Sequence, residues 1–133
     1  MELRKSSAEI TDYIHQCFRN YNRPYMNDYQ DFSFHFEEDG IVLAGVVAES
    51  LSDTIEVSYL YVEESQRKKG LWRRLLSVLE ENGRKAGMKR ILLNTYSFQA
   101  PEFYKKCGFR QIAEIDPCFG NHAQFYFVKT IEV

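Results

Sequence analysis

The chain has 133 residues, of which 44% are hydrophobic and 27% charged, and its formal net charge is −2. This length and composition predict one soluble globular domain, residues 1–133, with a single core. No apolar run approaches the roughly 20 residues that cross a bilayer, and the first residues lack the apolar core of a signal peptide. Three scattered cysteines form neither a CxxC pair nor an even set for disulfides. We therefore predict a cytoplasmic protein with reduced thiols that does not contact a membrane.

The first half of the chain predicts one helix followed by three strands. Residues 7–21 are amphipathic, and Ser6-x-x-Glu9 fits a capping box at the start of this helix. Alternating or β-branched apolar runs predict strands at residues 32–36, 41–48 and 54–62. Turns are expected between them at residues 38–40 and 51–53. The three strands should form an antiparallel meander.

The second half predicts two helices and three further strands. Leu71, Leu75 and Leu79 recur at helical spacing, and Gly87 is a plausible end of this helix over residues 70–86. A buried strand follows at residues 89–95, then a short helix from Pro101 to Cys107. Strands at 110–115 and 123–131 close the chain, with Pro117 in the loop between them. Strands and helices in this order predict an α/β fold.

A short basic loop joins the third strand to the second helix. It reads Gln66-Arg67-Lys68-Lys69-Gly70 and leads into the first turn of the helix. The first amides of a helix lack intrahelical partners and favour anions, so the loop and helix together predict a pyrophosphate cradle. A solvated basic turn is the alternative interpretation. A nucleic-acid surface is disfavoured because the domain is net acidic, and we expect no nucleic-acid partner.

Two motifs resemble the GNAT superfamily of acetyl-CoA-dependent N-acetyltransferases. Arg67-x-x-Gly70-x-Trp72 is similar to the loop that follows that family's fourth strand. Ala100-x-x-Phe103-Tyr104-x-x-x-Gly108-Phe109 is similar to its late helix and the Gly-Phe that ends it. The stretches 97–100 and 120–122 look like a bacterial branch of the superfamily. The resemblance implies a GNAT-like α/β (α+β) fold, with a mixed central sheet, a splayed strand pair and flanking helices.

The resemblance also implies acetyl-CoA as cosubstrate and an amine as acceptor. On its pattern, coenzyme A would be bound by Leu60, Tyr61, Val62, Arg67, Lys68, Lys69, Gly70, Leu71, Trp72, Arg73, Ser97, Ala100, Phe103 and Tyr104. Three of these residues depart from the family pattern. Trp72 replaces a small residue, Lys68 a glycine and Ser97 an asparagine. A non-catalytic acyl-CoA-binding or regulatory module of the same fold is therefore the alternative function.

Chemistry in such a site needs no covalent enzyme intermediate, because an amine can attack the thioester directly in a ternary complex. Tyr104 occupies the family position of the proton donor to the departing thiolate. Glu56 is the first candidate for a general base and His122 the second, although bulk water can serve instead. No His, Cys or Asp cluster has the spacing of metal ligands.

The acceptor is expected between the first helix and the loop after it, the splayed strands and the final hairpin. Candidate lining residues are Tyr21, Tyr25, Tyr29, Glu56 and His122. A small amine, a peptide N-terminus and a protein lysine all fit this expectation. The aromatic last strand, Phe125-Tyr126-Phe127, is compatible with pairing across a homodimer or with filling the core.

Overall fold

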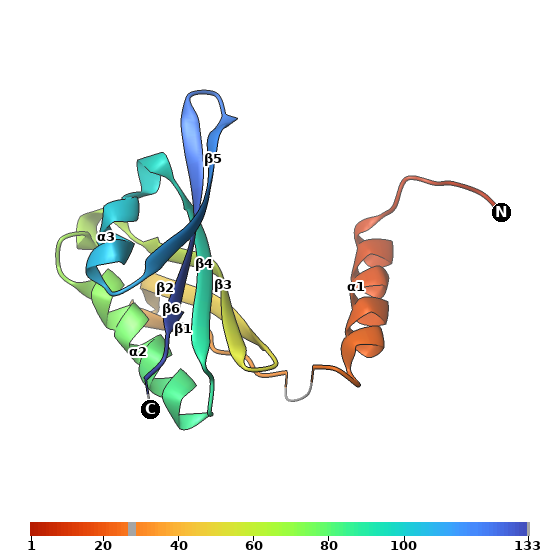
Figure 1. The fold of residues 1–133 in the computed structure, drawn as a ribbon, viewed down its shortest axis with the longest axis horizontal. Helices are drawn as coiled ribbons and strands as arrows, with labels where there is room; N and C mark the ends of the chain where they lie inside the picture. The colour runs from red at the N-terminus through yellow and green to blue at the C-terminus, as the bar shows by residue number, and fades with distance from the viewer. Residues whose placement is uncertain (27–28, 133) are drawn as a thin grey trace.

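The computed structural model describes residues 1–26 and 29–132, and it is built on one six-stranded mixed sheet (Figure 1). The helices are α1 (Ala8–Asn22), α2 (Leu71–Lys85) and α3 (Pro101–Lys106). The strands are β1 (Phe34–Glu38), β2 (Ile41–Leu51), β3 (Thr54–Val62), β4 (Arg90–Tyr96), β5 (Arg110–Phe119) and β6 (His122–Thr130). Two short 3₁₀ turns, η1 (Glu64–Gln66) and η2 (Ser97–Gln99), precede α2 and α3. The predicted α/β class with a mixed sheet and flanking helices is confirmed.

The strand order is β1-β2-β3-β4-β6-β5, and only β3 and β4 are parallel. A parallel pair needs a crossover connection, which α2 supplies between these two strands. Their pairing is short, because it joins only Thr54–Glu56 to residues 90–92. Beyond this point β3 continues for six residues and β4 for four. The facing edges of the two strands are therefore unpaired with each other over most of their length.

A bulge in β3 lies at the start of this unpaired region. In the register with β2, Val47 pairs with Tyr59 and Ala48 with Val57, so Ser58 is the extra residue. A bulge bends its strand and increases the local twist. Its position just after the last β3–β4 pair gives a local reason for the splay.

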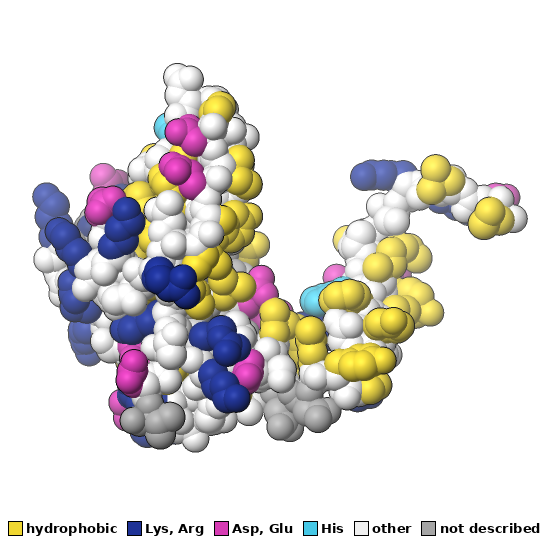
Figure 2. Space-filling model, in the orientation of Figure 1, with side chains coloured by type: hydrophobic (Ala, Val, Ile, Leu, Met, Phe, Trp, Pro, Cys, Tyr) yellow, Lys and Arg dark blue, Asp and Glu magenta, His cyan; other side chains and the backbone are white. Residues whose placement is uncertain are grey.

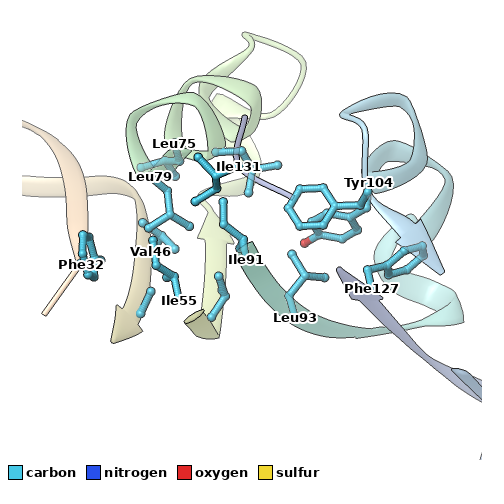
Figure 3. Packing of buried hydrophobic residues seen from close by; sticks show 14 of the residues in the cluster. Phe32, Val46, Ile55, Leu75, Leu79, Ile91, Leu93, Tyr104, Phe127 and Ile131 are labelled. Carbon is cyan, nitrogen blue, oxygen red and sulfur yellow. The ribbon is translucent and has the colours of Figure 1, made fainter. Parts of the chain in front are cut away.

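The core lies between the sheet and the helices α2 and α3 (Figure 3). Leu75 and Leu79, four residues apart on α2, pack over Val46, Ile55 and Ile91 of three strands, and all five are almost fully buried. The helix lies close to the sheet at Gly83, where an added Cβ would lie 2.7 Å from Ile55 Cδ1. The predicted leucine stripe thus faces the sheet.

Helix α1 stands apart from the sheet (Figure 1). None of its residues is buried. It is linked to β2 by an ion pair of 3.4 Å between Arg19 and Glu49. Its N-cap is Ser7, whose Oγ accepts a hydrogen bond from the Ile10 amide, so the predicted capping box at Ser6 is wrong by one residue.

The final hairpin also differs from the prediction. Strand β5 extends to Phe119 and contains Pro117, which was expected in a loop. The strand continues because β5 is at the edge of the sheet, where a proline need not donate to a neighbour. Strand β6 lies between β4 and β5, and Phe127 is fully buried. Phe125 and Phe127 therefore face the core, and β6, which pairs with a strand on each side, cannot add a strand across a dimer.

Candidate active site

The basic loop between β3 and α2 is bent by two residues with positive φ. Lys68 has φ 70° and Gly70 φ 79°, the left-handed region that favours glycine. The guanidinium Nε of Arg67 donates to the Val62 carbonyl at 3.2 Å and ties the loop to the end of β3. Lysine and arginine side chains gather along the edge of the molecule where this loop lies (Figure 2). The loop thus places the start of α2 next to the end of β3 and surrounds it with positive charge.

The N-terminus of α2 begins at Gly70, which has no side chain to cap the helix. The first bond across the turn runs from the Arg74 amide to the Gly70 carbonyl, at 3.0 Å. The amides of residues 71–73 precede this bond, and the first turn contains no acidic residue. Free amides at the positive end of a helix dipole favour an anion. The predicted cradle residues are therefore assembled as a group.

Trp72 is turned toward α3. Its ring meets the Phe103 ring edge-on at 5.6 Å between centroids and the Tyr104 ring at 6.1 Å. The indole is packed against the core and is half-buried. Its Nε1 is buried near the Tyr104 hydroxyl without meeting hydrogen-bond geometry. The large side chain therefore packs between two helices, and the backbone amide of residue 72 stays at the start of the helix.

Tyr104 lies in the core with only 4% of its surface exposed. It packs beside Phe127, at 5.8 Å between ring centroids, and near Leu93 (Figure 3). Burial raises the pKa of Tyr104 to about 12, although the Trp72 indole partly offsets this effect. A phenol with this pKa is protonated at neutral pH, so the hydroxyl is available as a donor.

Glu56 lies at the point where the two parallel strands separate, in the last β3–β4 pair, opposite Leu92. Alternation along β3 places its side chain on the sheet face opposite Ile55, Val57 and α2. Tyr104 contacts Phe127, which pairs with Leu93, the residue next to Leu92. Glu56 and Tyr104 are thus at the same level of the sheet, on its two opposite faces.

His122 lies at a different level. It is the first residue of β6, whereas Val128 is the β6 residue that pairs with Leu92. Six residues of extended strand span roughly 20 Å. The His122 ring instead contacts Phe98 at 4.9 Å and Phe119 at 5.2 Å. The structure therefore does not bring the two candidate bases together.

Two features of the site escaped the sequence analysis. One is Glu49, which pairs with Glu56 across β2 and β3 and accepts a hydrogen bond of 2.9 Å from the Tyr29 hydroxyl. The other is the exposed aromatic cluster in which Phe98 and Phe119 join Tyr96 and His122. Tyr29 and Glu49 are 20 residues apart, and the aromatic cluster joins residues 96–98 to residues 119–122. No local sequence pattern could therefore have revealed either feature.

The remaining candidates have local structural roles. Ser97 accepts a hydrogen bond of 3.2 Å from the Ala123 amide, which ties η2 to β6. Ala100 has φ 59° and forms the N-cap of α3. Leu60 and Val62 face the core side of β3, while Tyr61 faces the other side. A cavity of about 140 Å³ lies elsewhere, between α2 and β6, and neither Tyr104 nor any β3 residue lines it.

The chain resembles known proteins both in sequence and in structure. A family profile described as the acetyltransferase (GNAT) family matches residues 3–109. The chain belongs to the GNAT family. Among curated proteins, the acetyltransferase Atu2258 of Agrobacterium fabrum is 30% identical over 80 residues, which cover 60% of this chain and 58% of that protein. These matches confirm the family resemblance found in the sequence. The GNAT family is a family of acyltransferase enzymes.

Two crystal structures of acetyltransferases resemble this GNAT chain along almost its whole length. One, from Bacillus cereus, is 28% identical with a TM-score of 0.81, and one from Agrobacterium tumefaciens is 25% identical with a TM-score of 0.85. Each match covers 98% of this chain and 97% of the other.

Two kinds of feature are absent from residues 1–26 and 29–132. No cluster of His, Cys, Asp and Glu in these residues could hold a metal ion. No helix among them is long and apolar enough to span a bilayer.

Proposed function

We propose that this GNAT protein transfers the acetyl group of acetyl-CoA to a primary amine by direct attack in a ternary complex. The observation that carries the proposal is the opening between β3 and β4 beyond Glu56. The basic loop lies at the end of β3, and Tyr104 packs behind the opening. A structure of the same fold, a streptothricin acetyltransferase from Bacillus anthracis, is in complex with acetyl coenzyme A.

The groups around the opening between β3 and β4 fit coenzyme A. After Glu56, the backbone groups on the edge of β3 that faces β4 form no pairs with β4. An extended arm that contains amides, as that of coenzyme A does, can pair with such an edge. The amides of residues 71–73, with Arg67 and Lys69 near them, suit a pyrophosphate. Bound there, acetyl-CoA would supply the thioester carbonyl that the amine attacks.

The reaction needs a donor and an acceptor of protons. A nitrogen–carbon bond forms and the carbon–sulfur bond breaks, so the thiolate gains a proton and the amine loses one. In this proposal Tyr104 donates the proton, which is supported by a pKa of about 12 that keeps its hydroxyl protonated. Glu56 accepts the proton of the amine, directly or through water, which is supported by its position at the level of Tyr104 on the opposite face of the sheet. We do not assign this role to His122, which is roughly 20 Å along the strand.

A non-catalytic acyl-CoA-binding module is the second candidate function, and the position of Trp72 favours it. The indole packs against the ring of the proposed donor, Tyr104. If this contact held the hydroxyl away from the thioester, the chain would bind coenzyme A without turning it over.

Two measurements on the whole chain separate these functions. Binding is followed as a rise in melting temperature with acetyl-CoA or coenzyme A, with NADH and a DNA duplex as controls. Turnover is followed as thiol release with a panel of small amines, peptides and lysine-containing proteins. An enzyme should show both signals, whereas a module should show only the rise in melting temperature. No stabilisation by coenzyme A would contradict both proposals.

A further inference from the structure

Helix α1 carries an apolar stripe that its own chain leaves exposed. The stripe consists of residues spaced three or four apart, which share one face of the helix: Ile10, Tyr13, Ile14, Cys17, Phe18 and Tyr21. The exposed fractions run from 48% at Ile10 to 73% at Tyr21. A stripe of this kind normally faces a protein core. In this chain it is left in water, which is unfavourable.

The outer sheet face is a second apolar surface without a cover. We use this name for the side chains that point away from α2, which include Val47, Tyr59, Tyr61, Ile115 and Tyr126. Val47 and Tyr59 are paired across β2 and β3, and they are 50% and 72% exposed. Figure 2 shows hydrophobic side chains along the side of the sheet that is turned toward α1. Large contiguous patches of this kind mark interaction sites.

The position of α1 keeps these two surfaces apart within one chain. Its last turn is held beside Glu49 of β2, through the ion pair of Arg19 and the placement of the same guanidinium 4.6 Å over the Tyr29 ring. From this attachment the helix leads away from its own sheet (Figure 1).

We propose that the protein is a dimer in which two copies exchange α1, so that the α1 stripe of each copy docks on the outer sheet face of the other. Both complementary surfaces belong to one chain. A two-fold axis therefore brings the α1 stripe of each copy onto the outer sheet face of the other. The same contact forms twice and leaves neither surface exposed. This closed arrangement explains why α1 can be helical without packing on its own chain.

The available area is sufficient for a stable dimer. The exposed aromatic and aliphatic side chains of one α1 stripe offer on the order of 100 Å² each, or roughly 500 Å² per helix. The sheet face loses a similar area, and the contact occurs twice, which gives about 2,000 Å² in total. Stable interfaces bury about 1,200–2,000 Å².

The exchanged helix would also border the acceptor. Glu56 lies on the outer sheet face, so the helix of the second copy would form one wall beside it. This consequence rests on the proposed function, whereas the dimer itself does not. An experiment that measures only molecular mass therefore tests the dimer without testing catalysis.

The test is light scattering during size exclusion on the full chain and on three double variants. The wild type should have twice the 15.7 kDa mass of one chain. Ile14→Glu with Phe18→Glu places charge in the α1 stripe, and Val47→Glu with Tyr59→Glu does so on the outer sheet face. Both variants should be monomeric. His15→Glu with Gln16→Glu is the matched control, on the opposite side of α1, and it should remain dimeric.

Each other outcome overturns the proposal. A monomeric wild type would mean that α1 folds onto its own sheet or stays free. A helix variant that remains dimeric would exclude α1 from the interface, and a dimeric sheet variant would exclude the outer sheet face. Circular dichroism checks that the variants are folded. The helix variant should keep its fold because α1 buries no residue in its own chain.

Discussion

At the scale of single residues, strand register separates the two candidate bases, Glu56 and His122. Glu56 and His122 are both plausible bases on chemical grounds, and nothing in their local sequence favours one of them. The register places Glu56 at the level of Tyr104 and His122 far along β6. Register depends on long-range pairing, so this choice could not be made from the sequence.

Tyr104→Phe tests the donor. The ring stays in place, so the fold and acetyl-CoA affinity should change little, while kcat should fall by 10²–10⁴-fold, the usual contribution of general acid catalysis. Because burial raises the pKa of Tyr104 to about 12, its ionisation should cause no fall in wild-type kcat below pH 11. Steady-state kinetics across pH measure both effects. An unchanged kcat when chemistry limits turnover would remove Tyr104 from the mechanism.

Lys68→Gly tests the backbone of the basic loop. The left-handed conformation costs a non-glycine residue about 1–2 kcal/mol, whereas glycine loses about 0.5–1 kcal/mol of extra chain entropy on folding. The variant should therefore be more stable, by up to about 1 kcal/mol, in urea unfolding. Lys69→Gly is the matched control, because Lys69 is not among the described positive-φ residues and should only lose stability. Equal effects at both positions would mean that Lys68 carries no conformational strain.

At the scale of elements, local patterns predicted most of the fold. The leucine spacing of α2 and the alternation of β1 to β3 reflect one buried face, which sequence records directly. Pro117 was wrongly predicted to lie in a loop. Its strand tolerates a proline because it is at the sheet edge, and that position depends on long-range pairing which the local sequence does not show. The splay of β3 from β4 was implied only by the family resemblance, since no residue pattern marks where two strands stop pairing.

Hydrogen exchange can test the splay and the basic loop as separate parts of the proposed cofactor site. Coenzyme A should slow exchange in residues 57–62, where its arm would pair with β3, and in residues 69–73, where its pyrophosphate would bind. Pantetheine lacks the pyrophosphate, so it should protect only the first segment. Mass spectrometry with peptide resolution measures this difference. Protection of residues 69–73 by pantetheine would contradict the division of the site between strand and loop.

At the scale of the whole molecule, the position of α1 is the feature furthest from sequence reasoning. Its amphipathic pattern predicts a helix with a partner and says nothing about which chain supplies it.

An exchanged dimer couples unfolding to dissociation, so its melting temperature should rise with protein concentration. Differential scanning calorimetry over a hundredfold range measures this dependence. The variant with Ile14→Glu and Phe18→Glu should melt at one temperature throughout, and lower than the wild type at high concentration. The variant with His15→Glu and Gln16→Glu should keep the concentration dependence, because its α1 stripe is intact. A wild-type melting temperature that does not depend on concentration would show that folding and association are uncoupled, and α1 would then have no role in holding two copies together.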